Sequence, residues 1–102
     1  MLLRRAINEL MDRSPNQEVI ETIREVAALV VGVDRIEKCL VRKMGFYYYV
    51  DMHVGVDPSM TVERSHEIAH EVKNKVRSRI PAVQDVLVHI EPTKKIKNEP
   101  AA

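Results

Sequence analysis

The sequence of 102 residues contains one cysteine, no tryptophan and only three glycines. A single cysteine, Cys39, cannot form an intrachain disulfide or a CxxC metal-thiolate site, and it fits a reducing compartment. The glycines are isolated from one another, so the chain has no glycine-rich phosphate-binding loop. No Ser-His-Asp set can be recognised either. We therefore expect neither a disulfide framework nor an enzyme.

Long apolar runs and an excess of one charge are also absent. The longest apolar run, VAALVVGV at 26–33, is far shorter than the roughly 20 residues of a membrane-spanning helix. The opening MLLRRAINEL is too short and too interrupted for a signal peptide. The formal net charge of +1 gives no general attraction to nucleic acid or anionic lipid. We expect one small soluble domain that does not insert into a bilayer.

Hydrophobic periodicity predicts two helices in the first third of the chain. Residues 2–11 place apolar side chains on one helical face. Ser14 is a good N-cap, Pro15 suits the first helical position, and Gln17 can complete a capping box. A second helix should therefore begin near residue 15, and Gly32 is a plausible stop signal.

Two strands, a third helix and a last strand are predicted to follow. Residues 34–43 read as a strand with imperfect alternation, and a turn at Met44-Gly45 joins it to a clearer strand over 46–56. Thr61 can cap a helix over 62–79, Pro81 ends it, and residues 84–91 form the last strand. The predicted buried stripe of that helix contains Val62, Ser65, Ile68, Ala69, Val72 and Val76.

This order predicts an α+β fold, an αββαβ sandwich whose three-stranded sheet carries two helices on one face. A right-handed crossover allows the last strand to lie parallel beside the first strand. The other face of the sheet then has no cover within the chain. We expect a helical linker segment over 1–14, the folded domain over 15–92 and a flexible tail over 93–102.

Four histidines are the residues most able to carry chemistry, because a neutral imidazole binds borderline metals. His53 lies in register with Asp51 on the polar face of one strand, and His89 lies in register with Glu91 on another. His66 and His70 are neighbours at i, i+4 on the predicted helix. By pattern alone, each of these pairs is either a metal-binding pair or an ordinary solvated one. Cys39 is similarly either a ligand or a small core residue.

Two other functions fit parts of the sequence. KMGFYYYVDM resembles the aromatic strand of an RNA-recognition motif, with Tyr47 and Tyr49 as stacking platforms on the open sheet face. The near-zero net charge and the missing strand before the first domain helix argue against that function. A regulatory domain that binds an organic ligand at a dimer interface is a third possibility, but no distinctive pocket can be read from the sequence.

Three segments of the chain are distinctive: ELMDRSP, LVRKMGFYYYVDMHVGVDPSMTVERSHEIAHEV and IPAVQDVLVHIEP. Together they resemble the cytoplasmic C-terminal domain of the cation diffusion facilitator (cation efflux) family. ELMDRSP is similar to the family's linker after its last membrane helix. LVRKMGFYYYVDMHVGVDPSMTVERSHEIAHEV resembles its strand pair and the start of its second helix, and IPAVQDVLVHIEP resembles its closing strand. The match runs from Leu2 to Pro92. It implies a metallochaperone-like (ferredoxin-like) fold, a homodimer, and zinc or another divalent transition metal as the bound ion.

The resemblance also implies a ligand set and a cellular setting. The family's ligands carry over onto His53, His66, His89 and Glu91. His70, four residues after His66, is a further candidate. Glu37 and Cys39 lie near the position of the family's first-strand ligand and are additional candidates, although the usual histidine is missing there. This departure favours one site per protomer, or one shared across the dimer, over a binuclear site. The implied partner is the membrane transport domain of the same protein, which places the domain on the cytoplasmic side of the cell membrane.

Overall fold

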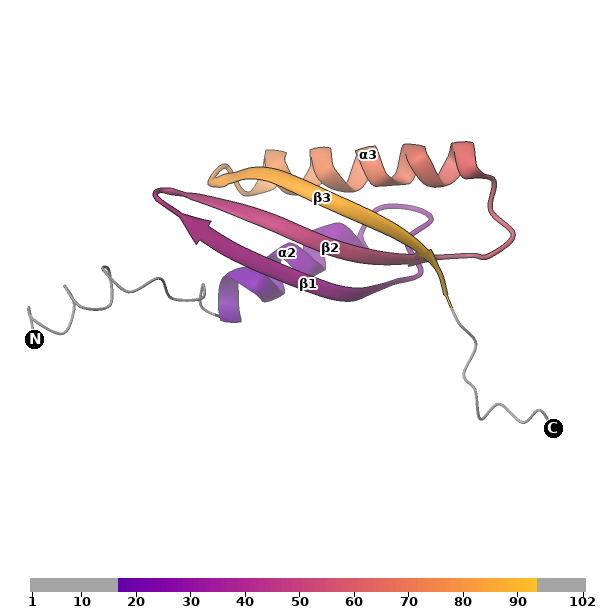
Figure 1. Ribbon diagram of the computed structural model, residues 1–102, viewed down its shortest axis with the longest axis horizontal. Helices are drawn as coiled ribbons and strands as arrows, with labels where there is room; N and C mark the ends of the chain where they lie inside the picture. The colour runs from indigo at the N-terminus through magenta and orange to yellow at the C-terminus, as the bar shows by residue number, and fades with distance from the viewer. Residues whose placement is uncertain (1–16, 94–102) are drawn as a thin grey trace, which may run out of the picture.

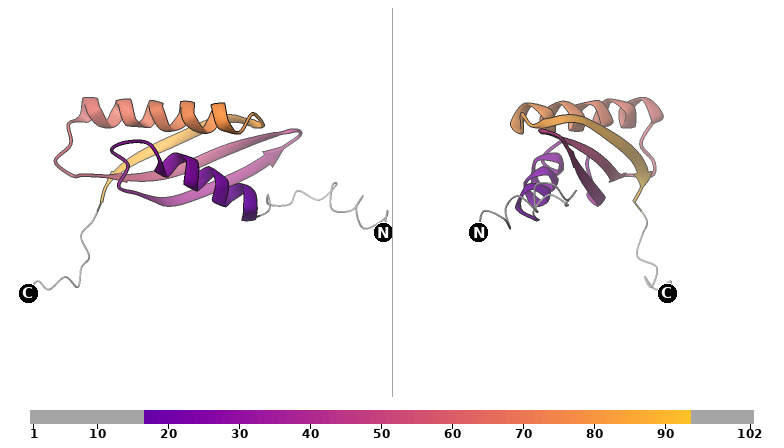
Figure 2. Two further views of the ribbon diagram at one scale, coloured as in Figure 1. Left: turned by 180° about the vertical axis from the view of Figure 1, so that it is seen from behind. Right: turned by 60° about the vertical axis from the view of Figure 1, so that its left-hand side comes forward.

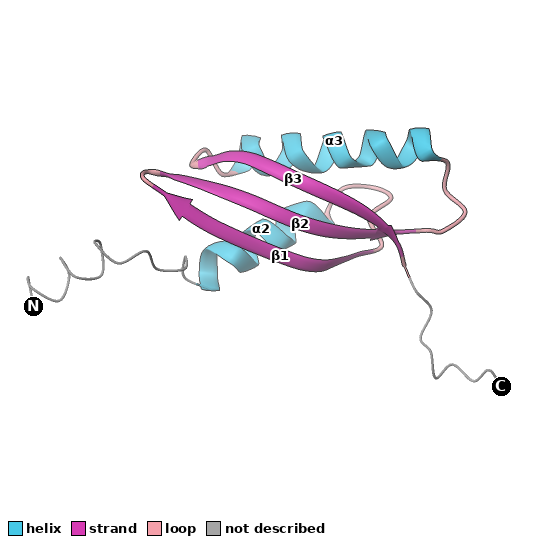
Figure 3. Ribbon diagram, viewed as in Figure 1, coloured by secondary structure: helices cyan, strands magenta, loops and turns pink. Residues whose placement is uncertain are grey.

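Within residues 17–93, the part of the chain that the computed structural model describes, two helices cover one face of a three-stranded sheet (Figure 1). The elements are α2 (Gln17–Ala28), β1 (Arg35–Met44), β2 (Tyr47–Val56), α3 (Val62–Arg79) and β3 (Val83–Pro92). Figure 3 shows the alternation of helix and strand that makes this an α+β fold, as predicted. The helix predicted over 2–11 and most of the tail predicted over 93–102 lie outside the described residues.

The strand order is β1-β2-β3, with β1 antiparallel and β3 parallel to β2. The prediction that the last strand lies beside the first strand was therefore wrong. β2 is the centre of the sheet because its core face is the most apolar: Val50, Met52, Val54 and Val56 are all buried. A central strand is paired along both edges, so the most buried strand gains most from that position.

The imperfect alternation of β1 has a structural cause. Its register with β2 shifts between Ile36 and Lys38, which leaves Glu37 as an extra residue in the ladder. Such a bulge turns a side chain away from the face that simple alternation gives it. The hairpin loop that follows is Gly45-Phe46, one residue later than the predicted turn, since Met44 pairs with Tyr47. Gly45 has a φ of +67°, which glycine adopts at little cost.

The hydrophobic core lies between the helices and the sheet. Ile68, Val72 and Val76 of α3 are fully buried. Val62 was wrongly predicted to share this stripe, because its side chain is 84% exposed. At about 100° per residue, Val62 lies only about 40° around the helix from Val76, so its exposure reflects its place as the first residue of α3 and not its angle around the helix. Ser65 and Ala69 are only half-buried.

The two helices leave the second face of the sheet open. Viewed from behind, α2 and α3 lie in front of the sheet, so both cover the same side (Figure 2). The open face carries the exposed side chains of Leu40 and Leu87, and Asp51 lies between them in the ladder. No helix among the described residues is long and apolar enough to cross a membrane.

Candidate metal centre

Two histidines meet on the open face of the sheet. His53 of β2 and His89 of β3 are direct partners in the parallel ladder. Their imidazole rings stack with centroids 4.5 Å apart and planes 23° apart. Asp51, two residues before His53, lies on the same face because side chains alternate along a strand. Strand register therefore brings His89 together with Asp51 and His53, which lie in a distant part of the sequence.

The nitrogen and oxygen atoms of this trio converge. Asp51 Oδ1 lies 3.0 Å from His89 Nε2 and 4.0 Å from His53 Nε2. One ligand atom from each of the three residues falls within 4.8 Å of the others, which is close enough for a single metal ion. Two imidazole nitrogens and one carboxylate oxygen are a donor set that zinc and similar ions accept, with coordination positions left over.

Asp51 Oδ1 is the atom that most directly points to a cation. It is covered from solvent and forms no hydrogen bond among the described residues, although it lies 3.0 Å from Nε2 of His89. A covered carboxylate oxygen without a partner is unfavourable. A metal ion held by Asp51, His53 and His89 would supply the missing positive charge, so the residues present fit such an ion.

Glu91 plays a different part from these three residues. Its Oε2 atom lies 2.5 Å from His53 Nδ1, on the other side of the imidazole ring from Nε2. When Nδ1 carries the proton and donates it to Glu91, Nε2 is left free toward Asp51. The arrangement is that of a carboxylate that orients a metal-binding histidine.

The structure separates the remaining predicted ligands from this cluster. His66 and His70 lie on α3, which packs on the opposite face of the sheet, with their Nε2 atoms 3.2 Å apart. Cys39 pairs with Met52 on the core face, and burial raises the pKa of its thiol, partly offset by the charge of Arg24. Neither α3 nor the core face supplies a ligand to the trio.

Glu37 lies nearer to the cluster than the other additional candidates. Its Oε2 atom would be 3.2 Å from a β-carbon at Gly55, the residue two positions after His53. The bulge in β1 thus directs this carboxylate toward the open face. It is still not one of the three converging residues.

Asp51 is the ligand candidate that sequence reasoning omitted. The sequence did contain the signal, because Asp51 shares a strand face with His53 at i, i+2. What periodicity does not give is the 3.0 Å approach to His89 from a different strand.

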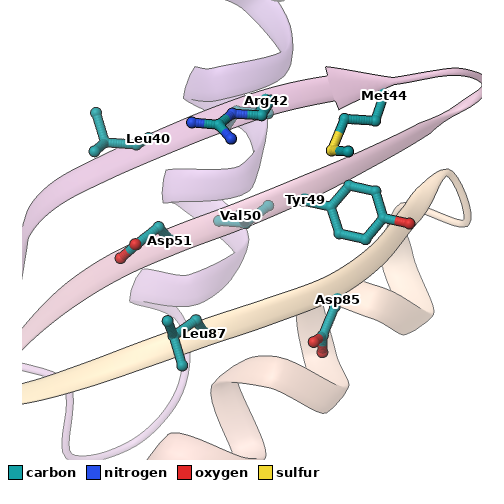
Figure 4. A pocket seen from close by; sticks show the side chains of 9 residues that line it. Leu40, Arg42, Met44, Tyr49, Val50, Asp51, Asp85 and Leu87 are labelled. Atoms are coloured by element: carbon teal, nitrogen blue, oxygen red, sulfur yellow. The ribbon is translucent and has the colours of Figure 1, made fainter.

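Beside the cluster, the open face forms a hollow of about 720 Å³ between β1, β2 and β3. Figure 4 shows Leu40, Asp51 and Leu87 across the three strands, with Tyr49 and Asp85 further along. Tyr49 is thus on the open face, as the RNA-binding alternative requires. The carboxylates in the same hollow oppose a phosphate backbone.

Comparison with known proteins identifies the family. The family described as "Cation efflux protein, cytoplasmic domain" matches residues 15–93. The chain belongs to this family. The family resemblance noted in the sequence is thereby confirmed.

Two relatives of this cation efflux domain match most of the chain but are much longer than it. The chain is 31% identical over 91 residues to the manganese efflux system protein MneP of Bacillus subtilis, covering 89% of this chain and 31% of that protein. It is 35% identical over 86 residues to the magnetosome protein MamM of Magnetospirillum gryphiswaldense, covering 84% of this chain and 27% of MamM. The chain therefore spans less than a third of either relative.

Solved structures of the MamM C-terminal domain share the fold of the cation efflux domain. One, comprising the domain alone, has a TM-score of 0.74 at 34% identity and covers 76% of this chain and 98% of that chain. A variant of that domain in a nickel form has a TM-score of 0.75 at 32% identity, covering 78% of this chain and all of that one. A cadmium form of another variant has a TM-score of 0.74 at 32% identity, and the match covers 76% of this chain and 98% of that one.

Proposed function

We propose that this chain is the metal-binding dimerisation module of a divalent-cation efflux transporter. The observation that carries the proposal is the convergence of Asp51, His53 and His89 around a covered carboxylate oxygen that accepts no hydrogen bond among the described residues. Membership of the cation efflux family supports the transport setting. The transport domain itself would be supplied by further sequence of the kind that makes up the rest of the relatives.

The open face of the sheet is the surface on which a second copy would pack. It carries Leu40 and Leu87, each 57% exposed, and the metal cluster lies on the same face. Burying exposed leucines against a second copy is favourable by about 25 cal/mol per Å² of apolar surface. The coordination positions that Asp51, His53 and His89 leave open then face the partner protomer.

Electrostatics would make this dimer respond to the metal. Packing two open faces together brings Asp51 and Glu91 of one protomer toward the same carboxylates of the other, which repel. A bound cation removes that cost, so the ion stabilises the closed dimer over the free protomers. The metal can shift the equilibrium toward the dimer only by as much as its affinity for the dimer exceeds its affinity for the free protomers.

The donor set favours zinc or a neighbouring transition metal as the ligand. Two imidazoles suit zinc, nickel, cobalt and copper better than magnesium or calcium. The names of the relatives mention manganese, cadmium and nickel, so their metals differ. We propose zinc as the reference ion for testing, with the carboxylate of Asp51 extending the range to harder ions.

Calorimetric titration of zinc into the full chain tests the site. The wild-type chain should bind zinc, and His89→Ala should reduce its affinity at least tenfold because one of the converging nitrogens is removed. Sedimentation with and without zinc tests the dimer, which should be favoured by the ion. Equal zinc affinity in the wild type and in His89→Ala would overturn the site. A chain that stays monomeric with zinc at high concentration would overturn the metal-stabilised dimer.

A further inference from the structure

The imidazoles of His66 and His70 converge on the outer surface of α3. They lie at i, i+4, their Nε2 atoms are 3.2 Å apart, and their rings meet edge to face with centroids 4.6 Å apart. Both side chains are exposed, and each is the other's only recorded partner among the described residues. The resemblance grouped His66 with the strand histidines, but the fold places it on the other side of the sheet.

The separation of the two nitrogens matches the bite of one metal ion. At metal–nitrogen bonds of about 2.0–2.1 Å, tetrahedral coordination places two nitrogens about 3.3 Å apart, and square coordination about 2.9 Å. The observed 3.2 Å falls between these values. A single ion can therefore be held by both nitrogens without moving the helix.

The surroundings leave these nitrogens accessible. Glu67 and Glu71 are engaged by Arg64, whose Nη1 lies 3.1 Å and 3.5 Å from their carboxylates. Glu63, three residues before His66, lies on the same side of the helix and makes no ion pair within residues 17–93. It offers a carboxylate oxygen as a third ligand.

The helix is also a rigid support for a site. α3 runs from Val62 to Arg79 and is anchored by its fully buried stripe of Ile68, Val72 and Val76. Ligands on an anchored helix are held more closely in place than ligands on a loop. The histidines thus converge on a surface that does not need to fold around the ion.

Residues 66–70, HEIAH, also match the HExxH pattern of zinc hydrolases, in which the glutamate acts as a general base. Here Glu67 accepts a hydrogen bond from Arg64 instead. The geometry of the pair favours binding rather than hydrolysis.

We propose that His66 and His70, with Glu63, form a second metal site on the helical face, separate from the cluster on the sheet. It would take a borderline transition metal such as nickel, copper or zinc, with water completing the coordination. Because its three protein ligands are exposed, it holds the ion more weakly than a buried site. The proposal does not depend on the sheet cluster binding metal.

The test uses the full chain with His53→Ala and His89→Ala already introduced, so that the sheet cluster cannot contribute. Nickel binding is measured by calorimetry. In a separate titration with diamagnetic zinc, nuclear magnetic resonance follows the nitrogen chemical shifts of the two remaining imidazoles, His66 and His70. We expect one ion per chain, with both imidazoles shifting together. Adding His70→Gln should weaken nickel binding at least tenfold.

A matched control keeps the composition and the charge. His70→Asn together with Asn74→His preserves the number of histidines but moves the second imidazole one helical turn further from His66. The swap should bind nickel as weakly as His70→Gln, with an unchanged helical circular dichroism spectrum. Nickel binding by the swap that equals the parent's would overturn the proposal, as would a zinc titration that shifts only one imidazole.

Discussion

The Nδ1 atom of His53 lies 2.5 Å from Oε2 of Glu91, and this contact decides which nitrogen of the imidazole is free. With Nδ1–H donated to the carboxylate, Nε2 points toward Asp51 and His89. The sequence resemblance placed Glu91 in the ligand set. The geometry instead favours Glu91 as the residue that orients a ligand.

Removing the Glu91 side chain should weaken zinc binding without abolishing it. We expect Glu91→Ala to cost about 10–100-fold in affinity, the range typical of residues that orient a metal-binding histidine. Glu91→Gln should cost less, because its amide oxygen can still accept the Nδ1–H bond. Calorimetry on both variants provides the measurement. If Glu91→Ala removes as much affinity as His89→Ala, then Glu91 is itself a ligand.

The alternation in β2 was the part of the fold and site most readable from the sequence. Apolar residues on one face and Asp51 and His53 on the other predicted the half-buried strand correctly, because a sheet covered on one side imposes that period. The αββαβ order and the capping of α3 by Thr61 followed from equally local signals.

Strand order and side-chain convergence were not readable, because they depend on contacts between distant segments. The same crossover through α3 permits β3 beside either strand, and only the packing of the whole sheet places it on β2. The choice of neighbour sets the 4.5 Å stacking of His53 and His89. It likewise decides that His66 lies on the far side of the sheet.

Asp51→Asn should separate metal binding from the stability of the metal-free domain. Asparagine keeps the shape of the side chain and loses only a half-exposed ion contact with His89, so the free energy of unfolding of the metal-free domain should change little. Zinc at about 100 times its dissociation constant should stabilise the wild type by about 2.7 kcal/mol. That increment should largely vanish in Asp51→Asn. A variant that zinc stabilises as much as wild type would contradict the assigned role of Asp51.

Gly32→Ala should destabilise the domain more than Gly45→Ala. Both glycines have positive φ, +102° and +67°, so both alanines carry a conformational cost of about 1–2 kcal/mol. At Gly32 the new β-carbon would also lie 2.5 Å from Ile68 Cδ1, whereas nothing lies within 4 Å at Gly45. Urea unfolding of the two variants measures the difference. Equal losses would mean that Ile68 moves aside at no cost.

Cys39 should react slowly with iodoacetamide at neutral pH. Burial disfavours the thiolate and raises the pKa of this thiol, so the reactive form is scarcer than in a free cysteine. The alkylation rate should climb with pH only above the usual thiol range and should match free cysteine after unfolding. Cys39→Ala should leave zinc affinity unchanged, because the side chain faces the core with Met52. A loss of zinc affinity in that variant would show that the thiol reaches the metal.

Leu87→Lys should prevent dimerisation while leaving the protomer folded. Leu87 is 57% exposed on the open face, so a lysine there costs the single chain little but places a charge in the proposed interface. Leu29→Lys is a matched control, because Leu29 is similarly exposed (61%) but follows α2, away from the open face. Sedimentation at a series of concentrations in the presence of zinc should show a weakened dimer for Leu87→Lys alone. Equal weakening of the dimer by the two substitutions would contradict an interface on the open face, because only Leu87 lies on that face.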